Sequence, residues 1–388
     1  MLSSLIAFAL AAAPAHTAPE GPLVTVLDDK LHATTGTLVS VRDGTATVRT
    51  EGKETAVQKA VAVVAAEMWG PQRDWPGLGE DAPPAGNVTV QLTDGSRLRG
   101  DLLAGKGDGL VLVHRTLGKV EFPLDTLARL ETRPTEPSEA GGKRTGDTVR
   151  LINGDRFDGF IESIAAGKGE SQGNGLAVTI EHDKTKTAVP LERVAWAALG
   201  GGTKTAPTAT VWLAGGEQAG VVEFSTDALE ARVVRAKGSV PANVRVTELR
   251  GTLLAPSAVS PLAACTVRSG GMVERGAEQS LGTRDLTLPE PEQVAFELPK
   301  GARRVTGWAV LPEECRRLGD CTVRIAAAGA DQSREKMLAE FTLNGASPIF
   351  AVNVELPTDA AWLSVTVGEG KNGPVQDRVV LRRVLVGK

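Results

Sequence analysis

Apolar and polar residues alternate over short runs along most of this chain of 388 residues. The runs at 88–92 and 148–151 lead into the turn dipeptides Asp94-Gly95 and Asn153-Gly154. Such dipeptides suit a type I′ turn, whose two central residues both need a positive φ angle, and they are strong signals of a β-hairpin. The pattern therefore predicts an all-β protein built from short strands and tight turns.

The hairpin pattern recurs at a fixed distance along the chain. Leu92 and Leu151 lie 59 positions apart, and so do Gly100 and Gly159. Each of these glycines falls in the returning strand of its hairpin, where glycine often marks a bulge or a sharp bend. The shared spacing indicates an internal repeat rather than two unrelated hairpins.

The second half of each copy repeats as well. The stretch 119–128 matches 187–195, and in both a proline ends one strand before a short turn leads into the next. Each copy, at 86–133 and at 146–199, is therefore predicted to hold about five short strands.

Two weaker copies extend the array to four. They lie at 23–69 and 208–254, and atypical terminal copies are expected in stacked repeats. Five short, bent strands in so few residues resemble the small SH3-like and Sm-like barrels, so tandem five-stranded barrels are expected. Segments rich in Pro, Gly and charge separate the copies and are expected to be irregular.

The C-terminal region, 257–388, has longer alternating runs. Val294, Phe296 and Leu298 share one face of a strand, with Glu297 opposite. Period two over several such segments, with turns between them, predicts a β-sandwich.

This region also carries a family resemblance. The segments that carry it are Gly282–Leu288, Val294–Ala309, Gly319–Ile325, Val352–Leu356, Trp362–Val367 and Gln376–Val379. In their order these segments resemble the NPCBM family of carbohydrate-binding modules. The resemblance implies a galactose-binding-like jelly-roll sandwich of the kind found in secreted proteins and sometimes beside glycosidases. Where the family commonly has a Gly-x-Gly-x-His-like run, residues 280–284 of this chain lack histidine.

The N-terminal segment, 1–18, has the features of a secretory signal. An apolar run from Leu5 to Ala13 leads into Ala13-Pro14-Ala15, which has small residues where signal peptidase reads them. We predict export to the periplasm or the medium, with cleavage near Ala15; an uncleaved anchor and a poorly structured N-terminal segment are the alternatives. No later stretch reaches the ~20 apolar residues of a membrane-spanning helix, so no span is expected in the mature chain.

Composition excludes several kinds of function. The formal net charge of −4 gives no broad basic surface, so nucleic acid is not expected as a partner. The whole chain has four histidines, with none after His182, and this argues against a metal site or a Ser-His-Asp triad within one domain. We therefore predict no catalytic residues, no cofactor and no metal.

Tryptophan is the residue type that points to a ligand. Glycan-binding faces stack sugars on Tyr or Trp, and this chain has six Trp and no Tyr. The predicted ligand-binding residues are Trp308, Trp362, Asp377 and Arg378. Trp362 alternates with Ser364 on the more polar face of its strand. Burial of the tryptophans in the sandwich core, and a structural role for Asp377 in holding a loop, are the alternatives.

The cysteines allow one local cross-link. Cys315 and Cys321 bracket a short turn-like loop that a disulfide could close in an oxidising compartment, whereas two buried thiols are the alternative. Cys265 has no obvious partner.

These features favour an exported, non-catalytic binding or scaffold protein. Its C-terminal module would recognise a carbohydrate or cell-surface glycan, and its repeats would act as spacers or dock other proteins. The alternative is an accessory subunit or hydrolase acting on polysaccharide, although the chain lacks room for an additional catalytic domain of ~250 residues. A third reading, an RNA-binding Sm-like array, is disfavoured by export and by the acidic charge balance.

Overall fold

The computed structural model is built almost entirely of β-strands. It describes residues 21–71, 88–105, 109–133, 146–166, 175–202, 206–237, 239–269, 273–289, 292–330, 335–371, 373 and 377–388. Every regular element in these ranges is a strand or a 3-10 turn. This confirms the all-β fold class. The predicted signal segment, 1–18, lies outside the described residues.

The repeat region forms four groups of strands, named units 1 to 4. Unit 1 holds β1 (Leu23–Leu27), β2 (Ala33–Arg42), β3 (Thr45–Thr50), β4 (Lys53–Val57) and β5 (Ala62–Ala65). Unit 2 holds β6 (Val88–Leu92), β7 (Arg97–Ala104), β8 (Gly109–His114), β9 (Gly118–Pro123) and β10 (Leu127–Glu131). Unit 3 holds β11 (Asp147–Leu151), β12 (Arg156–Ala166), β13 (Leu176–His182), β14 (Thr185–Pro190) and β15 (Val194–Ala198). Unit 4 holds β16 (Ala209–Leu213), β17 (Gln218–Val221), β18 (Glu223–Thr226), β19 (Glu230–Val234), β20 (Ala242–Arg245) and β21 (Leu249–Leu253).

The two predicted hairpins are present, but their turns differ from the expected type. Gly95 and Gly154 have φ angles of +86° and +95°, whereas Asp94 and Asn153 are not in the positive region. The Asp94 side chain instead accepts a hydrogen bond from the backbone N–H of Ser96 at 2.8 Å. Because the acidic or amide side chain stabilises the turn locally, only the glycine needs the left-handed conformation.

The bend glycines are required by close approach of neighbouring backbone. A Cβ atom on Gly100 would lie 2.4 Å from the carbonyl oxygen of Val113, and one on Gly159 would lie 2.3 Å from that of Glu181. Any larger residue would push the third strand of the unit away. The glycine pattern in the sequence therefore marks where each sheet curls over itself.

The units are open curled sheets rather than the closed barrels that were expected. In unit 1 the strands pair in the order β4-β3-β2-β1-β5, and no pairing of β4 with β5 closes the sheet in the described residues. The reason is that β5 uses its second edge to pair with β21 of unit 4. In the same way β10 of unit 2 pairs with β15 of unit 3. A strand has only two edges, and both edges of β5 and of β10 are already paired, so neither strand can close its own unit into a barrel.

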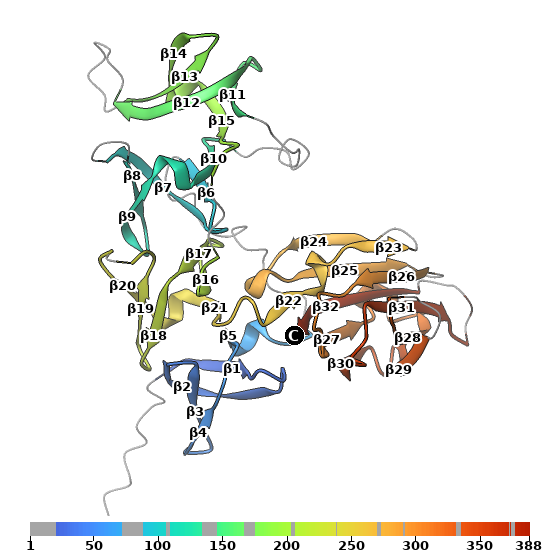
Figure 1. Cartoon of the computed structure of the whole chain (residues 1–388). Helices are drawn as coiled ribbons and strands as arrows, with labels where there is room; N and C mark the ends of the chain where they lie inside the picture. Colours follow the sequence, from blue (N-terminus) through green and yellow to red (C-terminus); the bar gives the residue numbers. More distant parts are fainter. Residues whose placement is uncertain are drawn as a thin grey trace, which may run out of the picture.

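The units form a rod whose order differs from their order in the sequence. Figure 1 shows units 3, 2, 4 and 1 stacked from top to bottom, with strand pairing joining 3 to 2 and 4 to 1. Units 2 and 4 meet between the two pairs, where Arg97 of β7 lies opposite Gln218 of β17. The contact there is largely polar, since Arg235 forms an ion pair with Asp94 at 3.1 Å.

The C-terminal region is a sandwich of two antiparallel sheets, as predicted. The rod-side sheet holds β22 (Val259–Pro261), β24 (Glu274–Glu278), β25 (Arg284–Pro289), β27 (Arg304–Val310), β30 (Ile349–Glu355) and β32 (Arg378–Gly387). The far sheet holds β23 (Val267–Ser269), β26 (Glu292–Glu297), β28 (Asp320–Ala328), β29 (Glu335–Asn344) and β31 (Trp362–Glu369). Val294 and Phe296 are fully buried between the sheets, which confirms the face predicted from their alternation.

The sandwich is seated on units 1 and 4. A shared apolar cluster joins Leu31 of unit 1 and Trp212 of unit 4 to Leu281 and Leu385 of the sandwich. The guanidinium of Arg383 donates a hydrogen bond to the carbonyl oxygen of Gly70, just after unit 1. The sandwich is therefore packed against the rod rather than tethered to it. Among the described residues, no helix has the length and hydropathy that crossing a membrane requires.

Candidate functional site

Trp308 lies on the rod-side sheet, in the strand β27. Val305 and Ala309 of the same strand point into the sandwich core, so strand alternation places Trp308 on the outer surface of this sheet. Its cross-strand neighbour on β32 is Arg382, which donates a hydrogen bond to the carbonyl oxygen of Pro71 at 2.5 Å. Trp308 is half-buried on the side of the sandwich that faces the rod.

Trp362 lies on the opposite surface, at the start of β31 in the far sheet. Leu363 and Val365 belong to the core, so Trp362 and Ser364 face outward, as their alternation predicts. The guanidinium carbon of Arg268 lies 5.4 Å from the centre of the indole ring, a cation–π arrangement. The half-buried ring therefore has one face covered by a long, partly exposed side chain.

Asp377 and Arg378 occupy a third place, at the start of β32. Asp377 is buried, and its Oδ1 accepts a hydrogen bond from the backbone N–H of Asp320 at 2.9 Å. Burial raises the pKa of the Asp377 carboxyl, with the nearby Asp320 adding to the shift. Arg378 points to solvent. Asp377 thus holds a loop, and the four predicted residues do not form one binding surface.

The cysteines form no cross-link in this structure. Cys265, Cys315 and Cys321 are buried thiols, so of the two alternatives the sequence left open for Cys315 and Cys321, the structure has the buried thiols and not the disulfide. Hydrogen bonds from the backbone N–H groups of Leu318 and Gly319 to the carbonyl oxygen of Cys315 close the loop instead. Cys315 and Cys321 both belong to the apolar core of the sandwich.

The outer face of the far sheet combines an aromatic ring with polar side chains. Gln293 of β26 lies opposite Thr366 of β31, and its Nε2 donates a hydrogen bond to Oγ of the buried Ser364 at 3.1 Å. Glu297 is the residue of β26 that lies opposite Trp362. Arg268 forms an ion pair with Glu297 at 3.2 Å next to the indole. The strand pairings of this sheet are all internal to the sandwich, and Figure 1 shows the sheet on the side away from the rod. This face is thus equipped with donors, acceptors and a ring.

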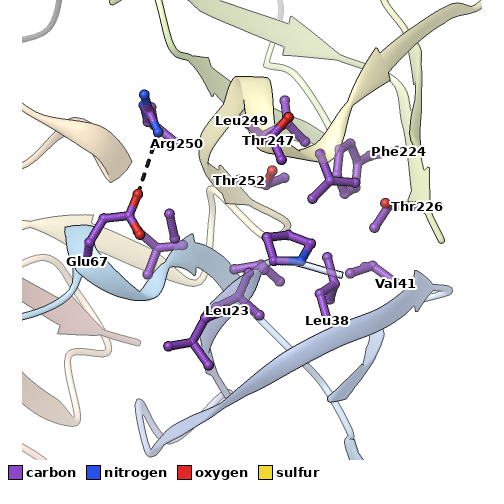
Figure 2. A pocket seen from close by; sticks show the side chains of 16 residues that line it. Leu23, Leu38, Val41, Glu67, Phe224, Thr226, Thr247, Leu249, Arg250 and Thr252 are labelled. Carbon is purple, nitrogen blue, oxygen red and sulfur yellow. Dashed lines mark ion pairs between the residues drawn. The ribbon is translucent and has the colours of Figure 1, made fainter. Parts of the chain in front are cut away.

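An apolar cavity of about 200 Å³ lies between units 1 and 4. Figure 2 shows Leu23, Leu38 and Val41 of unit 1 facing Phe224 and other side chains of unit 4 across it. Glu67 and Arg250 form an ion pair of 3.6 Å at its edge. The cavity lies beside the pairing of β5 with β21, and its lining also includes Thr226, Thr247 and Thr252 of unit 4.

A larger hollow, of about 430 Å³, lies at the corresponding joint between units 2 and 3. Phe160 and Glu162 of β12 line one side, and Asp125, in the 3-10 turn after β9, lines the other. The Phe160 ring is 65% exposed. Sequence reasoning missed this residue, because its place after the bend glycine predicts a strand but not which units that strand will face.

A buried histidine lies where units 2 and 4 meet. His114 is 3% exposed, and its Nδ1 accepts hydrogen bonds from the backbone N–H groups of Thr116 and Leu117, both at 3.0 Å. Glu217 of unit 4 lies 3.8 Å from its Nε2. Burial, aided by the nearby Arg235, lowers the pKa of His114 to about 4. The ring is neutral and serves as a structural acceptor.

Metal-ligating side chains do not gather in the described part of the chain. No group of three or more His, Cys, Asp or Glu residues there is arranged to hold a metal ion.

Comparison with known proteins gives only distant likenesses. No family model and no curated protein matches the sequence. A solved structure of CBM51-2 and INT domains from Clostridium perfringens ZmpB, in complex with GlcNAc, is 11% identical with a TM-score of 0.29, covering 43% of this chain and 37% of that one. CBM51 from Clostridium perfringens GH95, in complex with methyl-galactose, is 9% identical with a TM-score of 0.27, covering 33% and 99%.

A family 29 carbohydrate-binding module, the CBM29-2 K85A mutant, is 7% identical with a TM-score of 0.23, covering 32% of this chain and 82% of that one. Because this chain covers little more than a third of the first structure named, nothing about the whole of that protein transfers. At these identities and scores the function of this chain has to be argued from its own residues.

Proposed function

We propose that this protein is an exported, non-catalytic carbohydrate-binding protein whose ligand site is the outer face of the far sheet. The observation that carries the proposal is the position of Trp362, a half-buried ring on a polar face that points away from the rod. The NPCBM resemblance of the C-terminal region supports the same ligand class.

The face has the chemistry that a sugar ring needs. The apolar face of a pyranose stacks on an indole, while its hydroxyl groups exchange hydrogen bonds with amides, hydroxyls and charged groups. Gln293 supplies an exposed amide, and Arg268 with Glu297 supplies a charged pair next to the indole. Arg268 lies over the indole, so a bound sugar would displace it or stack on the opposite face.

Packing against the rod determines which sheet of the sandwich is exposed. Units 1 and 4 hold the rod-side sheet through the shared apolar cluster, and this leaves the far sheet as the exposed surface of the sandwich. We propose that the four units act as a rigid spacer that presents this surface at the periphery of the cell, in the periplasm or the medium.

The test compares full-length variants in affinity electrophoresis through gels containing galactan, mannan or xylan. Trp362→Ala is expected to abolish retardation by whichever polysaccharide slows the parent, because the stacking platform is lost. Leu318→Ala, a 44% exposed residue in the loop before β28, at the opposite end of that strand from Trp362, is the control and should migrate like the parent. Equal retardation of Trp362→Ala and parent would place the site elsewhere.

The non-catalytic part of the proposal has its own test. The parent protein is incubated with each polysaccharide and new reducing ends are measured. We expect none above the level of a heat-inactivated sample. Release of sugars would instead favour the alternative function, a hydrolase or accessory subunit acting on polysaccharide.

A further inference from the structure

The indole of Trp362 is covered by a side chain of the protein itself. The guanidinium carbon of Arg268 lies 5.4 Å from the centre of the ring. Nε of Arg268 donates a hydrogen bond to a carboxylate oxygen of Glu297 at 3.2 Å, and Glu297 lies opposite Trp362 on the neighbouring strand β26. The ion pair therefore holds the guanidinium beside the ring.

Arg268 occupies the part of the indole that a ligand could reach. Trp362 is half-buried, and its Nε1 is buried and accepted by no hydrogen-bond partner in the described part of the chain. The pyrrole side of the ring is thus packed against protein. On the β28 side the neighbour is Ala328, whose methyl group is too short to cover an indole. The area next to Arg268 is therefore what Trp362 offers to a stacking sugar.

A second Arg–Glu–Trp group in this chain has the same chemistry in a structural setting. Arg129 lies over Trp196 at 4.6 Å and pairs with Glu131 at 2.5 Å, where units 2 and 3 join. Arg129 and Trp196 are each 5% exposed, so this group is closed to solvent. The side chains of Arg268 and Glu297 are 56% and 42% exposed. The group on the sandwich is therefore open to exchange with a ligand, whereas the one in the rod is not.

The contacts that hold Arg268 in place are weak enough to be replaced. Exposed cation–π contacts and exposed ion pairs each contribute little, because water competes for both. A sugar that takes the place of the guanidinium stacks on the same aromatic surface and leaves Arg268 free to turn into solvent. Displacement lowers the affinity of the sugar by a factor of about two to five, the equivalent of an exposed cation–π contact.

We infer that Arg268 is an internal competitor at the ligand site: it occupies the indole of Trp362 in the free protein, and a sugar has to displace it to bind. This role rests on the proposed function, since both concern the ring of Trp362. Glu297 holds Arg268 in place, so the ion pair sets how much of the indole is available.

The test adds two full-length variants to the affinity electrophoresis, each compared with its own migration in a gel without polysaccharide. Arg268→Ala should bind the polysaccharide that retards the parent about two- to fivefold more tightly, because the competitor is gone. Arg232→Ala is the matched control. It removes the same charge from an exposed ion pair of unit 4, with Glu223 at 3.2 Å, and should bind like the parent.

Salt supplies a readout that a merely structural role for Arg268 would not change. Calorimetric titration with the same polysaccharide is carried out at about 0.05 M and about 0.5 M NaCl, where an exposed ion pair is screened weakly and strongly. A neutral sugar carries no charge, so salt acts on its binding through the protein. The affinity of the parent should rise with salt toward that of Arg268→Ala, which should stay constant.

The outcomes separate this inference from the proposed function. Binding by Arg268→Ala that is equal to or weaker than that of the parent, together with loss of binding in Trp362→Ala, overturns the inference and leaves the ligand site standing. A difference between parent and Arg268→Ala that does not narrow with salt overturns the inference as well, because Glu297 would not hold the competitor. Failure of both parent and Arg268→Ala to bind any of the polysaccharides overturns the proposed function and the inference together. Because Arg268 is largely exposed, its replacement leaves the core intact.

Discussion

Stability of the joint between units 2 and 4 should depend on the protonation of His114. Above pH 6.5 the imidazole is neutral in both the folded and the unfolded chain. As the pH falls from 6.5 toward 4, His114 binds a proton in the unfolded chain but stays neutral in the folded chain, so the free energy of unfolding decreases. The pKa difference corresponds to about 3 kcal/mol, at about 1.4 kcal/mol per pH unit, and most of it is lost by about pH 4.

The hydrogen bonds of His114 explain why it stays neutral in the folded chain. Nδ1 accepts hydrogen bonds from two backbone N–H groups, so a proton on this nitrogen would point at two other donors and break both hydrogen bonds. His114→Asn is the matched variant, because an amide oxygen can take the place of Nδ1 as acceptor and does not titrate. Glu217 has a pKa raised by burial and changes stability in the opposite sense, so parent and variant are compared at each pH.

The assay is urea unfolding followed by tryptophan fluorescence at several pH values. The stability of the parent relative to His114→Asn should fall by about 2–3 kcal/mol between pH 7 and pH 4.5. A stability difference that stays constant over this range would refute the neutral-acceptor role of His114.

Three further predictions concern the strands, the loop and the thiols. Gly100→Ala should cost about 1–3 kcal/mol in thermal or urea unfolding, because its Cβ would strike the backbone of Val113, whereas Gly201→Ala, with open space around it, should be neutral. Asp377→Ala should cost about 1–3 kcal/mol in the same assay by leaving the Asp320 N–H without its acceptor, while Asp377→Asn retains an acceptor and should be milder. A thiol reagent should modify no cysteine in the native chain and all three after denaturation, since burial raises the pKa of Cys315; fewer than three would reveal a disulfide.

Local features of the fold could be predicted from the sequence. The hairpins at Asp94-Gly95 and Asn153-Gly154, the bends at Gly100 and Gly159 and the alternating core face at Val294 all depend on residues close together in the chain. The open edges of the units could not be predicted. Pairing of β10 with β15 and of β5 with β21 joins segments far apart in sequence, and nothing in strands of four or five residues specifies which distant edge they will meet.

The candidate site was only partly predictable for the same reason. Alternation placed Trp362 on a polar face, and the structure agrees. It could not show that Trp308 lies on the other sheet, because the assignment of a strand to a sheet depends on the whole topology. Arg268 beside Trp362 carries no motif at all, since its importance arises only from what folding brings next to it.

The pairing of β5 with β21 joins the first repeat in the sequence to the last. During synthesis the first unit emerges with a bare strand edge and must wait until almost all of the repeat region has left the ribosome before its true neighbour appears. Fragments that stop after the third unit would keep that edge exposed and would tend to associate with other chains along it. Fragments made for study should therefore keep units 2 and 3 together and units 1 and 4 together, because strand pairing joins these units across the sequence.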